Sequence, residues 1–413
     1  MLSTIRPATS VREALTRVLL CRGTGQLVEA FHMRRSALKN FSDMDFIQRI
    51  DKPRFMSKLL FPYTAYFAAL GLDVGHLGND NAFDKMLLDA FTTSDGDFPP
   101  KLLNDLYVLD DLAEDDGRDL ILEEAEKQSL SLDGIVGQDL TAGEFAIAVH
   151  LAHPRILTIC HDKMQCRKVR NYEEYQARQR ENLTLELAKE KTTVMESEMA
   201  PWFEAKDRSR ACEIYVYQKG QEVMFQITHG RPFRVEPCLN RMLERGRTGL
   251  RPQKHDSVIY DTGSGVLKVN AQSVGERDLY RRTFGKVLFG DPEYFPGGEI
   301  YTLDPLRNGK AALAVVPGIE SVRLTEISIA VDNDEGFAQV SKAHDLIEAA
   351  ARYGQPNFQQ GTIVRAGMVV KYKAGGRGRK LELRPPRVAV YDRDRDGVVT
   401  EAFMRTNGFL KVG

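Results

Sequence analysis

The sequence contains no long hydrophobic run. A helix that spans a bilayer needs about 18 or more consecutive apolar residues, and every apolar stretch here is interrupted well before that length. At the N-terminus, Arg6, Arg12 and Arg17 interrupt the apolar positions, so the first residues predict an amphipathic helix rather than a signal peptide. We therefore expect no contact with a membrane.

Cysteine is scarce, and the net charge is close to zero. The five cysteines are an odd number without regular spacing, which does not fit the disulfide framework of a secreted domain. The formal net charge is only −1, so no overall field attracts nucleic acid or membrane. We expect a cytoplasmic protein whose binding to any charged partner comes from a local surface.

Motifs of nucleotide-dependent enzymes are also missing. The sequence has no GxxxxGK[ST] loop, and the glycine pairs within 23–25 and 376–378 lack the third glycine of a dinucleotide-binding loop. The nearest approach to the GxSxG nucleophile elbow lies at 263–265, where a hairpin turn is expected. These absences argue against an ATP or NAD cofactor and make an enzyme the less favoured interpretation.

The first 170 residues have the periodicity of helices. Leucines recur at helical spacing within 101–112, and 55–72 is apolar and aromatic enough for a buried helix. Thr141, followed three residues later by Glu144, fits the capping box that begins a helix. A chain of 413 residues is too long for one typical core, so we expect residues 1–170 to form a helical domain.

Residues 171–206 predict one long connecting helix. The stretch 172–200 is rich in Glu, Lys, Arg and Ala and almost free of Gly and Pro, and Pro201 follows it. Its apolar residues recur only sparsely, as in a partly exposed helix that joins two domains or forms a helical arm.

From residue 207 the pattern changes to that of strands. The segments 212–228 and 256–271 each contain two apolar runs around a glycine-containing turn, so each predicts a β-hairpin, with a short helix between the two hairpins. Helices are expected at 276–289, at 336–353 and near 400–406. Further short strands are expected at 300–303, 311–316, 321–331, 363–373, 380–384 and 387–391. Many strands without a βαβ rhythm favour an α+β fold with a mixed, mostly antiparallel domain over 207–413.

One cluster contains the side chains that bind zinc. Its members are His150, His153, Cys160, His161 and Cys166. The spacing matches no known finger or ribbon, and Pro154 redirects the chain inside the cluster. We therefore assign it no metal, and interpret the cysteines as buried and the histidines as exposed.

A second acidic segment resembles half of a calcium loop. Asp392, Asp394 and Asp396 alternate as in an EF-hand, but Phe403 occupies the twelfth position, where a bidentate glutamate is needed. The simpler interpretation is a turn at Asp396 and the following glycine.

The catalytic residues of a metal-dependent nuclease are not evident. Asp256, Asp261 and Lys268 lie on one predicted hairpin, but Val266 stands where a further acid is expected. His229 at a strand end has the chemistry to bind a phosphate, although a lone histidine there is more often exposed or hydrogen-bonded. We assign no catalytic residue.

Charge is distributed unevenly along the chain. Acidic residues dominate 73–127, whereas 371–387 contains seven basic residues against the single acid Glu382. Glycines in this basic segment allow close backbone approach, and Tyr372 and Tyr391 lie nearby for stacking on bases. We predict nucleic-acid contact through Lys371, Lys373, Arg377, Arg379, Lys380, Arg384 and Arg387.

Three functions stay open. The favoured one is a non-catalytic, intracellular, microbial accessory protein that binds nucleic acid or a nucleoprotein partner through its basic C-terminal half. Its acidic helical half would contact a protein or a second copy in a homo-oligomer. The alternatives are a metal-dependent nuclease or other hydrolase with an unrecognised site, and a protein–protein adaptor that oligomerises through the helical half. Salt separates the first from the adaptor, because phosphate contacts weaken steeply with salt.

Overall fold

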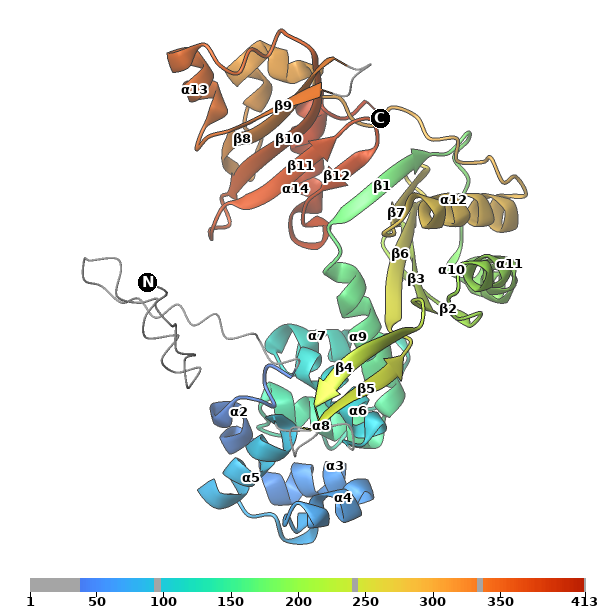
Figure 1. Cartoon of the computed structure of the whole chain (residues 1–413), viewed down its shortest axis with the longest axis vertical. Coiled ribbons are helices and arrows are strands. Elements are labelled where there is room, and N and C mark those ends of the chain that lie inside the picture. The colour runs from blue at the N-terminus through green and yellow to red at the C-terminus, as the bar shows by residue number, and fades with distance from the viewer. Residues whose placement is uncertain (1–37, 93–97, 240–243, 333–336, 412–413) are drawn as a thin grey trace, which may run out of the picture.

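The computed structural model describes residues 38–92, 98–239, 244–332 and 337–411. Helices fill the N-terminal part and a ten-stranded sheet dominates the C-terminal part, which confirms the α+β class (Figure 1). The amphipathic helix expected at the N-terminus lies outside the described residues. Among the helices in these ranges, none is both long and apolar enough to cross a bilayer.

The helical part is built around one apolar core. Its α-helices are α2 (Met44–Arg49), α3 (Ser57–Leu60), α4 (Thr64–Ala69), α5 (Asn81–Thr92), α6 (Pro100–Leu112), α7 (Asp115–Lys127), α8 (Ala142–Ala152) and α9 (Pro154–Arg167). The helix predicted over 101–112 is confirmed as α6, and Thr141 and Glu144 form the predicted capping box of α8. Pro154 lies where the chain changes direction between α8 and α9, as expected, and it begins α9, since its missing N–H is not needed in a first turn.

The single helix expected over 55–72 is wrong. A π-helical turn (Lys52–Met56) precedes α3, and a 3₁₀ turn (Phe61–Tyr63) separates α3 from α4. Pro62, which has no N–H to donate, interrupts the helical hydrogen bonds between α3 and α4.

All ten strands of the large sheet pair antiparallel. They are β1 (Asn171–Gln176), β2 (Cys212–Lys219), β3 (Glu222–Gly230), β6 (Gln253–Asp261), β7 (Val266–Asn270), β8 (Ile319–Asp332), β9 (Phe337–Lys342), β10 (Thr362–Tyr372), β11 (Arg379–Arg384) and β12 (Val388–Val390). Their order is β2-β3-β6-β7-β1-β12-β11-β10-β8-β9. The two predicted hairpins are confirmed as β2–β3 and β6–β7. Between them lies not a short helix but a third hairpin, β4 (Arg234–Leu239) and β5 (Arg245–Leu250).

The long connecting helix predicted within 171–206 is wrong. Residues 171–176 form β1, which lies in the middle of the sheet between β7 and β12. Two shorter helices follow, α10 (Leu185–Glu190) and α11 (Thr192–Ala205), with Pro201 inside α11. Tyr172 and Tyr175 are buried in the sheet, and this tertiary burial outweighs the helix propensity of the surrounding glutamates. The sheet therefore begins before residue 207.

Further differences occur in the last third of the chain. Helices α12 (Val274–Phe289) and α14 (Arg393–Thr406) confirm two predicted helices, and α14 begins earlier than expected. The expected helix over 336–353 is instead β9 followed by α13 (Leu346–Tyr353), because Asp345 caps α13 by accepting from two backbone N–H groups. A 3₁₀ helix (Asp304–Leu313) replaces the strand expected at 311–316, and 300–303 forms only an isolated bridge.

β1 divides the sheet into a first half, β2-β3-β6-β7, and a second half, β12-β11-β10-β8-β9. Helices cover these two halves on opposite faces. Val269 of β7 packs in the core with α10–α12, whereas Ala389 of β12 packs in the core with α13 and α14. In β1, Tyr172 is paired with Ala389, and Glu173 is paired with both Val269 and Val388. Directly opposed residues share a face. The sheet face that α12 covers in the first half is therefore continuous with one face of the second half. α14 covers the other face of the second half.

The face of the second half that no described helix covers is called the open face below. It consists of alternate residues of five strands: Ser321, Arg323, Glu326 and Ser328 of β8, Val340 and Lys342 of β9, Arg365, Gly367, Val369 and Lys371 of β10, Lys380, Glu382 and Arg384 of β11, and Val388 and Val390 of β12. The corresponding free side of the first half is closed by α9, where Cys166 Sγ lies 3.3 Å from Gln226 Oε1.

Candidate nucleic-acid interface

Five of the seven predicted basic residues lie on or beside the open face. Lys371, Lys380 and Arg384 belong to it, on β10 and β11. Lys373 and Arg377 are exposed in the turn between these strands, and no ion pair of either is present within the described residues. The local alternation of the hairpin therefore brings these five cations to one region, as predicted.

The other two basic residues are directed into the protein. Arg379 Nε lies 2.7 Å from Asp396 Oδ2 of α14, and its guanidinium lies over the ring of Tyr372. Arg387 Nη2 lies 3.1 Å from Glu173 Oε1 of β1. Both contacts join the hairpin to neighbouring elements, so these two arginines are removed from the candidate interface.

Strand pairing adds three cations that the sequence interpretation missed. Arg323, Lys342 and Arg365 come from β8, β9 and β10 and share the open face with the hairpin. In the register, Lys342 opposes Glu326, which opposes Gly367, which opposes Glu382. This row crosses four strands that are distant in sequence. Only strand alternation could have indicated which way each side chain points.

Two glutamates form the centre of the open face. Glu382 is buried, and its carboxylate accepts from Arg365 at 2.8 Å, from Lys380 at 2.6 Å and from Arg384. Burial alone would raise the pKa of Glu382, but the hydrogen bonds from these three cations outweigh it and lower the pKa to about 2. The second carboxylate, Glu326, lies 3.1 Å from Arg365 and 3.3 Å from Lys342.

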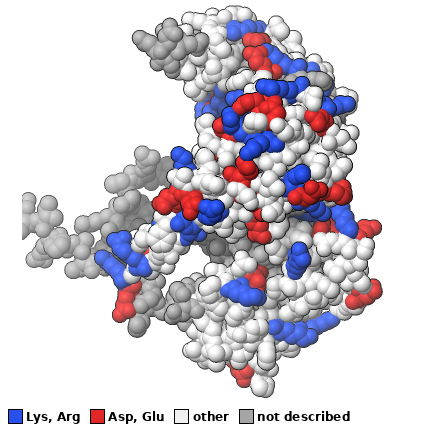
Figure 2. Space-filling model, turned by 90° about the vertical axis from the view of Figure 1, so that its right-hand side faces the viewer, with Lys and Arg blue, Asp and Glu red and all other residues white. Residues whose placement is uncertain are grey.

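Cations outnumber carboxylates across this surface. Six cations, Arg323, Lys342, Arg365, Lys371, Lys380 and Arg384, stand against Glu326, Glu382 and the Glu320 carboxylate that pairs with Lys371. The Lys342 and Lys380 side chains are 67% and 59% exposed, so their charges are available to a partner. Lys and Arg side chains lie among acidic ones over much of the face shown in Figure 2.

The tyrosines expected to stack on bases are not on the open face. The Tyr372 hydroxyl lies 2.8 Å from the Thr400 hydroxyl, and the Tyr391 hydroxyl donates to Glu401 at 2.9 Å. Both rings are buried against α14, on the other side of the sheet. The open-face positions named above include no aromatic residue, so this surface offers charge without a stacking platform.

The histidines and cysteines of the candidate metal cluster, to which the sequence analysis assigns no metal, do not converge in the described part of the chain. His150 Nε2 lies 3.8 Å from Asp105 and His161 Nε2 lies 3.1 Å from Asp111, so the two imidazoles have different partners. Burial raises the pKa of Cys160 to about 12 and that of Cys166 to about 11, which keeps both thiols protonated at neutral pH.

The acidic repeat before residue 397 forms no calcium loop. Asp392 is the N-cap of α14, Asp394 pairs with Lys219 at 2.5 Å, and Asp396 pairs with Arg379. The turn expected at Asp396 is wrong, because the cap at Asp392 starts the helix before it.

The three candidate residues of this hairpin are divided between the two faces of the sheet. Asp256 faces α12, whereas Asp261 and Lys268 lie on the opposite face, where Lys268 Nζ is 2.6 Å from Glu222 and 3.9 Å from Asp261. Of the two interpretations of His229, exposed or hydrogen-bonded, the structure has the hydrogen-bonded one. His229 is buried, and its ring stacks on Phe203.

Three buried residues, His229, Asp256 and Glu276, have ligand atoms close enough together for a metal ion. His229 Nε2 lies 2.9 Å from Asp256 Oδ2. However, Lys254 Nζ lies 2.6 Å from Glu276 and 3.0 Å from Asp256, so an ammonium group already occupies the cation position. The cluster is also closed to substrate, because all three side chains are at most 2% exposed. It fits a structural charge network better than a metal or catalytic site.

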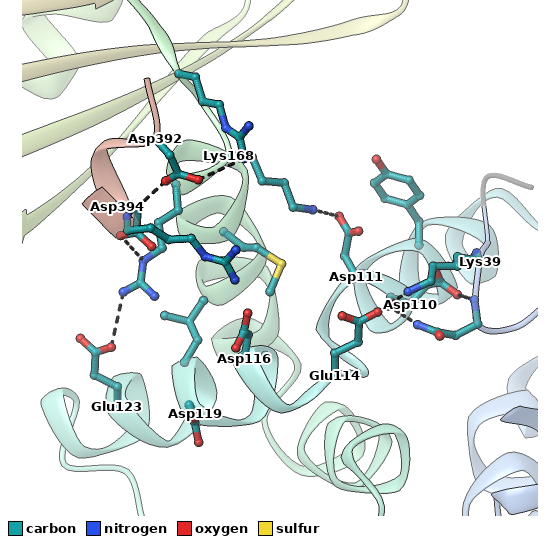
Figure 3. Close-up of a pocket in the computed structure, with 18 residues that line it drawn as sticks. Lys39, Asp110, Asp111, Glu114, Asp116, Asp119, Glu123, Lys168, Asp392 and Asp394 are labelled. Atoms are coloured by element: carbon teal, nitrogen blue, oxygen red, sulfur yellow. Dashed lines mark hydrogen bonds and ion pairs between the residues drawn. The ribbon is translucent and has the colours of Figure 1, made fainter. Parts of the chain in front are cut away.

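A cavity lies between the helical part and the start of α14 (Figure 3). Its volume is about 710 Å³. Acidic side chains of α6 and α7 face basic ones of α9, and pairs close across it, such as Lys168 with Asp111 at 3.2 Å and Arg170 with Asp392 at 3.0 Å. Asp116 and Asp119 add further negative charge. This acidic wall repels a phosphate backbone, so the open face is the better candidate.

No protein-family model matches the chain, and a search of curated proteins finds no relative.

Proposed function

We propose that the protein is a non-catalytic nucleic-acid-binding protein that contacts the sugar–phosphate backbone through the open face. The observation that supports the proposal is the excess of cations that four strands bring to one uncovered sheet face. Each phosphate contact releases counterions from the nucleic acid, so such a surface gains affinity from charge alone. An accessory role, with a nucleoprotein as the physiological partner, is consistent with this surface.

The geometry favours contact with backbone rather than with bases. Neighbouring strands are about 4.8 Å apart, so the cations form a two-dimensional array on a shallow surface. Without aromatic side chains at the named positions, bases have nothing to stack on. Binding is therefore expected to depend weakly on sequence and strongly on salt.

The glutamates of the open face do not prevent its cations from contacting a phosphate. Lys380 and Arg384 each pair with Glu382 while remaining largely exposed. Because the Glu382 carboxylate is buried, it keeps these partners, and a phosphate is expected to approach the exposed side of each cation.

The test is removal of three exposed lysine charges from the open face. In the variant Lys342→Gln, Lys371→Gln, Lys380→Gln, affinity for a duplex is expected to fall roughly 100-fold at 0.15 M salt. The slope of log affinity against log salt should decrease by about 2.7, which is 0.9 for each lost contact. Fluorescence anisotropy at several salt concentrations measures both quantities.

A matched variant controls for net charge. Lys58, Lys101 and Lys206 are exposed lysines away from the open face. Changing these three to Gln removes the same charge and should leave affinity within about twofold, because only charges near the phosphates release counterions. Both variants should melt at the wild-type temperature, since exposed substitutions usually change stability by under about 0.5 kcal/mol. Equal affinities of the two variants would overturn the proposal, as would a wild-type protein that binds no nucleic acid.

A further inference from the structure

The β4–β5 hairpin stands apart from the rest of the fold as an arm. Its two strands pair only with each other and not with the large sheet. In Figure 1 the arm leaves the ends of β3 and β6 and extends away from them. All described positions of β5 from Arg245 to Gly249 are exposed, as are Phe233 and Val235 beside β4.

The arm contributes little to the stability of the protein, so its presence calls for another explanation. A two-stranded ribbon without a third strand or a covering helix is marginally stable in water. Here the main packing contact is at its base, where the ring of Phe233 covers Gly249 so closely that an added Cβ would lie 2.6 Å from it. A ribbon that buries so little apolar surface gains order when a partner covers it.

The two faces of the arm differ in charge. The register pairs Pro237 with Arg247 and Leu239 with Arg245, so both arginines point to one face. Within the described residues, this face contains no acid, and neither arginine has an ion pair. On the other face, Arg234 is already paired with Glu236 at 3.0 Å.

We propose that the arm inserts into the major groove of double-stranded DNA, with the Arg245–Arg247 face toward the phosphates and base edges. This inference rests on the proposed function and specifies its nucleic acid. The major groove of B-form DNA is about 12 Å wide and admits a two-stranded ribbon, and a six-residue strand is about 20 Å long. The major groove of A-form RNA is too narrow for such an element.

The composition of the arm favours DNA over an acidic protein. Arginine presents a planar fork that bonds two phosphate oxygens or the O6 and N7 atoms of guanine. Gly246 carries no side chain, whereas Gly249 is covered on the arginine face by the ring of Phe233. This face therefore holds Val235, Pro237 and Phe233 beside the two arginines, and the choice of DNA over a protein rests on the arginines and on the dimensions of the ribbon.

The first experiment compares two double variants. Arg245→Gln, Arg247→Gln is expected to lower affinity for a DNA duplex roughly 30-fold at 0.15 M salt. Its affinity for single-stranded DNA and for duplex RNA of the same length should change less than twofold. The matched control, Arg155→Gln, Arg395→Gln, removes two exposed arginines elsewhere and should bind all three like the wild type.

The second experiment places a reporter on the arm without changing its arginines. Cys238 is exposed on the arm, whereas Cys160 and Cys166 are buried and Cys212 is half-buried. In a Cys21→Ser background, a fluorophore on Cys238 should change its emission on addition of duplex DNA and not on addition of single strands.

The outcomes separate the arm from the open face. If the wild type binds no nucleic acid, the proposed function and this inference both fail. If the wild type binds but the arm variant loses affinity for all three nucleic acids equally, or for none, the arm inference fails and the proposed function stands. Loss of self-association by the arm variant in sedimentation, with DNA binding unchanged, would assign the arm to a second copy of the chain and overturn the inference.

Discussion

Two buried glutamates, Glu276 on α12 and Glu382 on β11, have similar electrostatics and different surroundings. Burial would raise the pKa of each, but the hydrogen bonds of two or three cations lower it to about 2 in both Glu276 and Glu382. Their carboxylates are 0% and 1% exposed. Around Glu276, the Lys254 and Arg208 side chains are only 8% and 16% exposed. Around Glu382, by contrast, Lys380 is 59% exposed.

The exposure of the cations decides what each cluster can do. Removing one member of a buried pair leaves a charge that neither water nor protein solvates, at a cost of about 3–5 kcal/mol. Water solvates a cation on an exposed surface when its partner is lost. The Glu276 cluster therefore fixes α12 against β6, whereas the Glu382 cluster holds cations whose exposed sides can contact a partner.

The largest effect is expected when the buried cluster loses its lysine. Lys254→Met leaves Asp256 and Glu276 without their shared ammonium and should destabilise the protein by about 3–5 kcal/mol in urea unfolding. Lys380→Met, at the exposed cluster, should cost under about 1 kcal/mol. Equal losses in the two variants would mean that exposure of the cation does not distinguish the clusters.

An intermediate effect is expected when Glu382 loses its charge. Glu382→Gln should destabilise the protein by about 1–3 kcal/mol, because charged hydrogen bonds are replaced by neutral ones. It also releases Arg365, Lys380 and Arg384, so nucleic-acid affinity should rise about fivefold at 0.15 M salt, the effect of one additional charge. Titration of the folded variant with labelled duplex measures this rise.

The buried counterpart provides the control for that variant. Glu276→Gln should destabilise the protein at least as much while leaving affinity unchanged, because its cations cannot reach a partner. A lower affinity of Glu382→Gln would contradict the role assigned to the open face.

The smallest effect is expected at a buried carboxylate without a strong cation. Burial of Asp162 on α9 raises its pKa to about 6, since His161 compensates only in part. Because the folded-state pKa lies above the ordinary value of 3.8, the charged carboxylate lowers the stability of the protein above about pH 6, and stability is gained as the pH falls toward 4. Asp162→Asn should therefore raise stability at pH 7 by under about 1 kcal/mol, partly offset by weaker hydrogen bonding from Gln226.

The pH profile is the measurement for Asp162. The advantage of the asparagine variant should shrink between pH 7 and pH 4, as the wild-type carboxyl takes up its proton. Glu276 and Glu382 behave in the opposite way, because their folded-state pKa lies below the ordinary value of 4.5. Their stabilisation is complete above pH 4.5 and is lost between about pH 4.5 and 2. A variant more stable than wild type by the same amount at pH 4 and pH 7 would exclude a protonation effect at Asp162.

Local signals in the sequence predicted the local parts of the fold. The capping box at Thr141 and the hairpins β2–β3 and β6–β7 depend on residues a few positions apart, and all three formed as expected. β1 could not be predicted in this way. Glu173 is satisfied by Arg277 and Arg387, and Glu174 by Arg393, all from distant parts of the chain.

Local signals likewise predicted only the part of the candidate interface that is contiguous in sequence. The basic hairpin is visible in the sequence because β10 and β11 are neighbours in the chain. Arg323 and Lys342 join it only through pairing with β8 and β9, which no local pattern indicates. The direction of Arg379 toward Asp396, and of Tyr372 toward Thr400, depends on which face α14 covers.

The central position of β1 determines the order in which the sheet can be completed during synthesis. β1 leaves the ribosome early, but its partner β12 is made near the end of the chain, as the pairing of Asn171 with Val390 requires. Until then, one edge of β1 has unpaired N–H and C=O groups that can pair with another nascent chain. Contacts between such distant residues also slow folding, because a long loop must close first. The strand that joins the two halves is therefore the last part of the sheet to be secured.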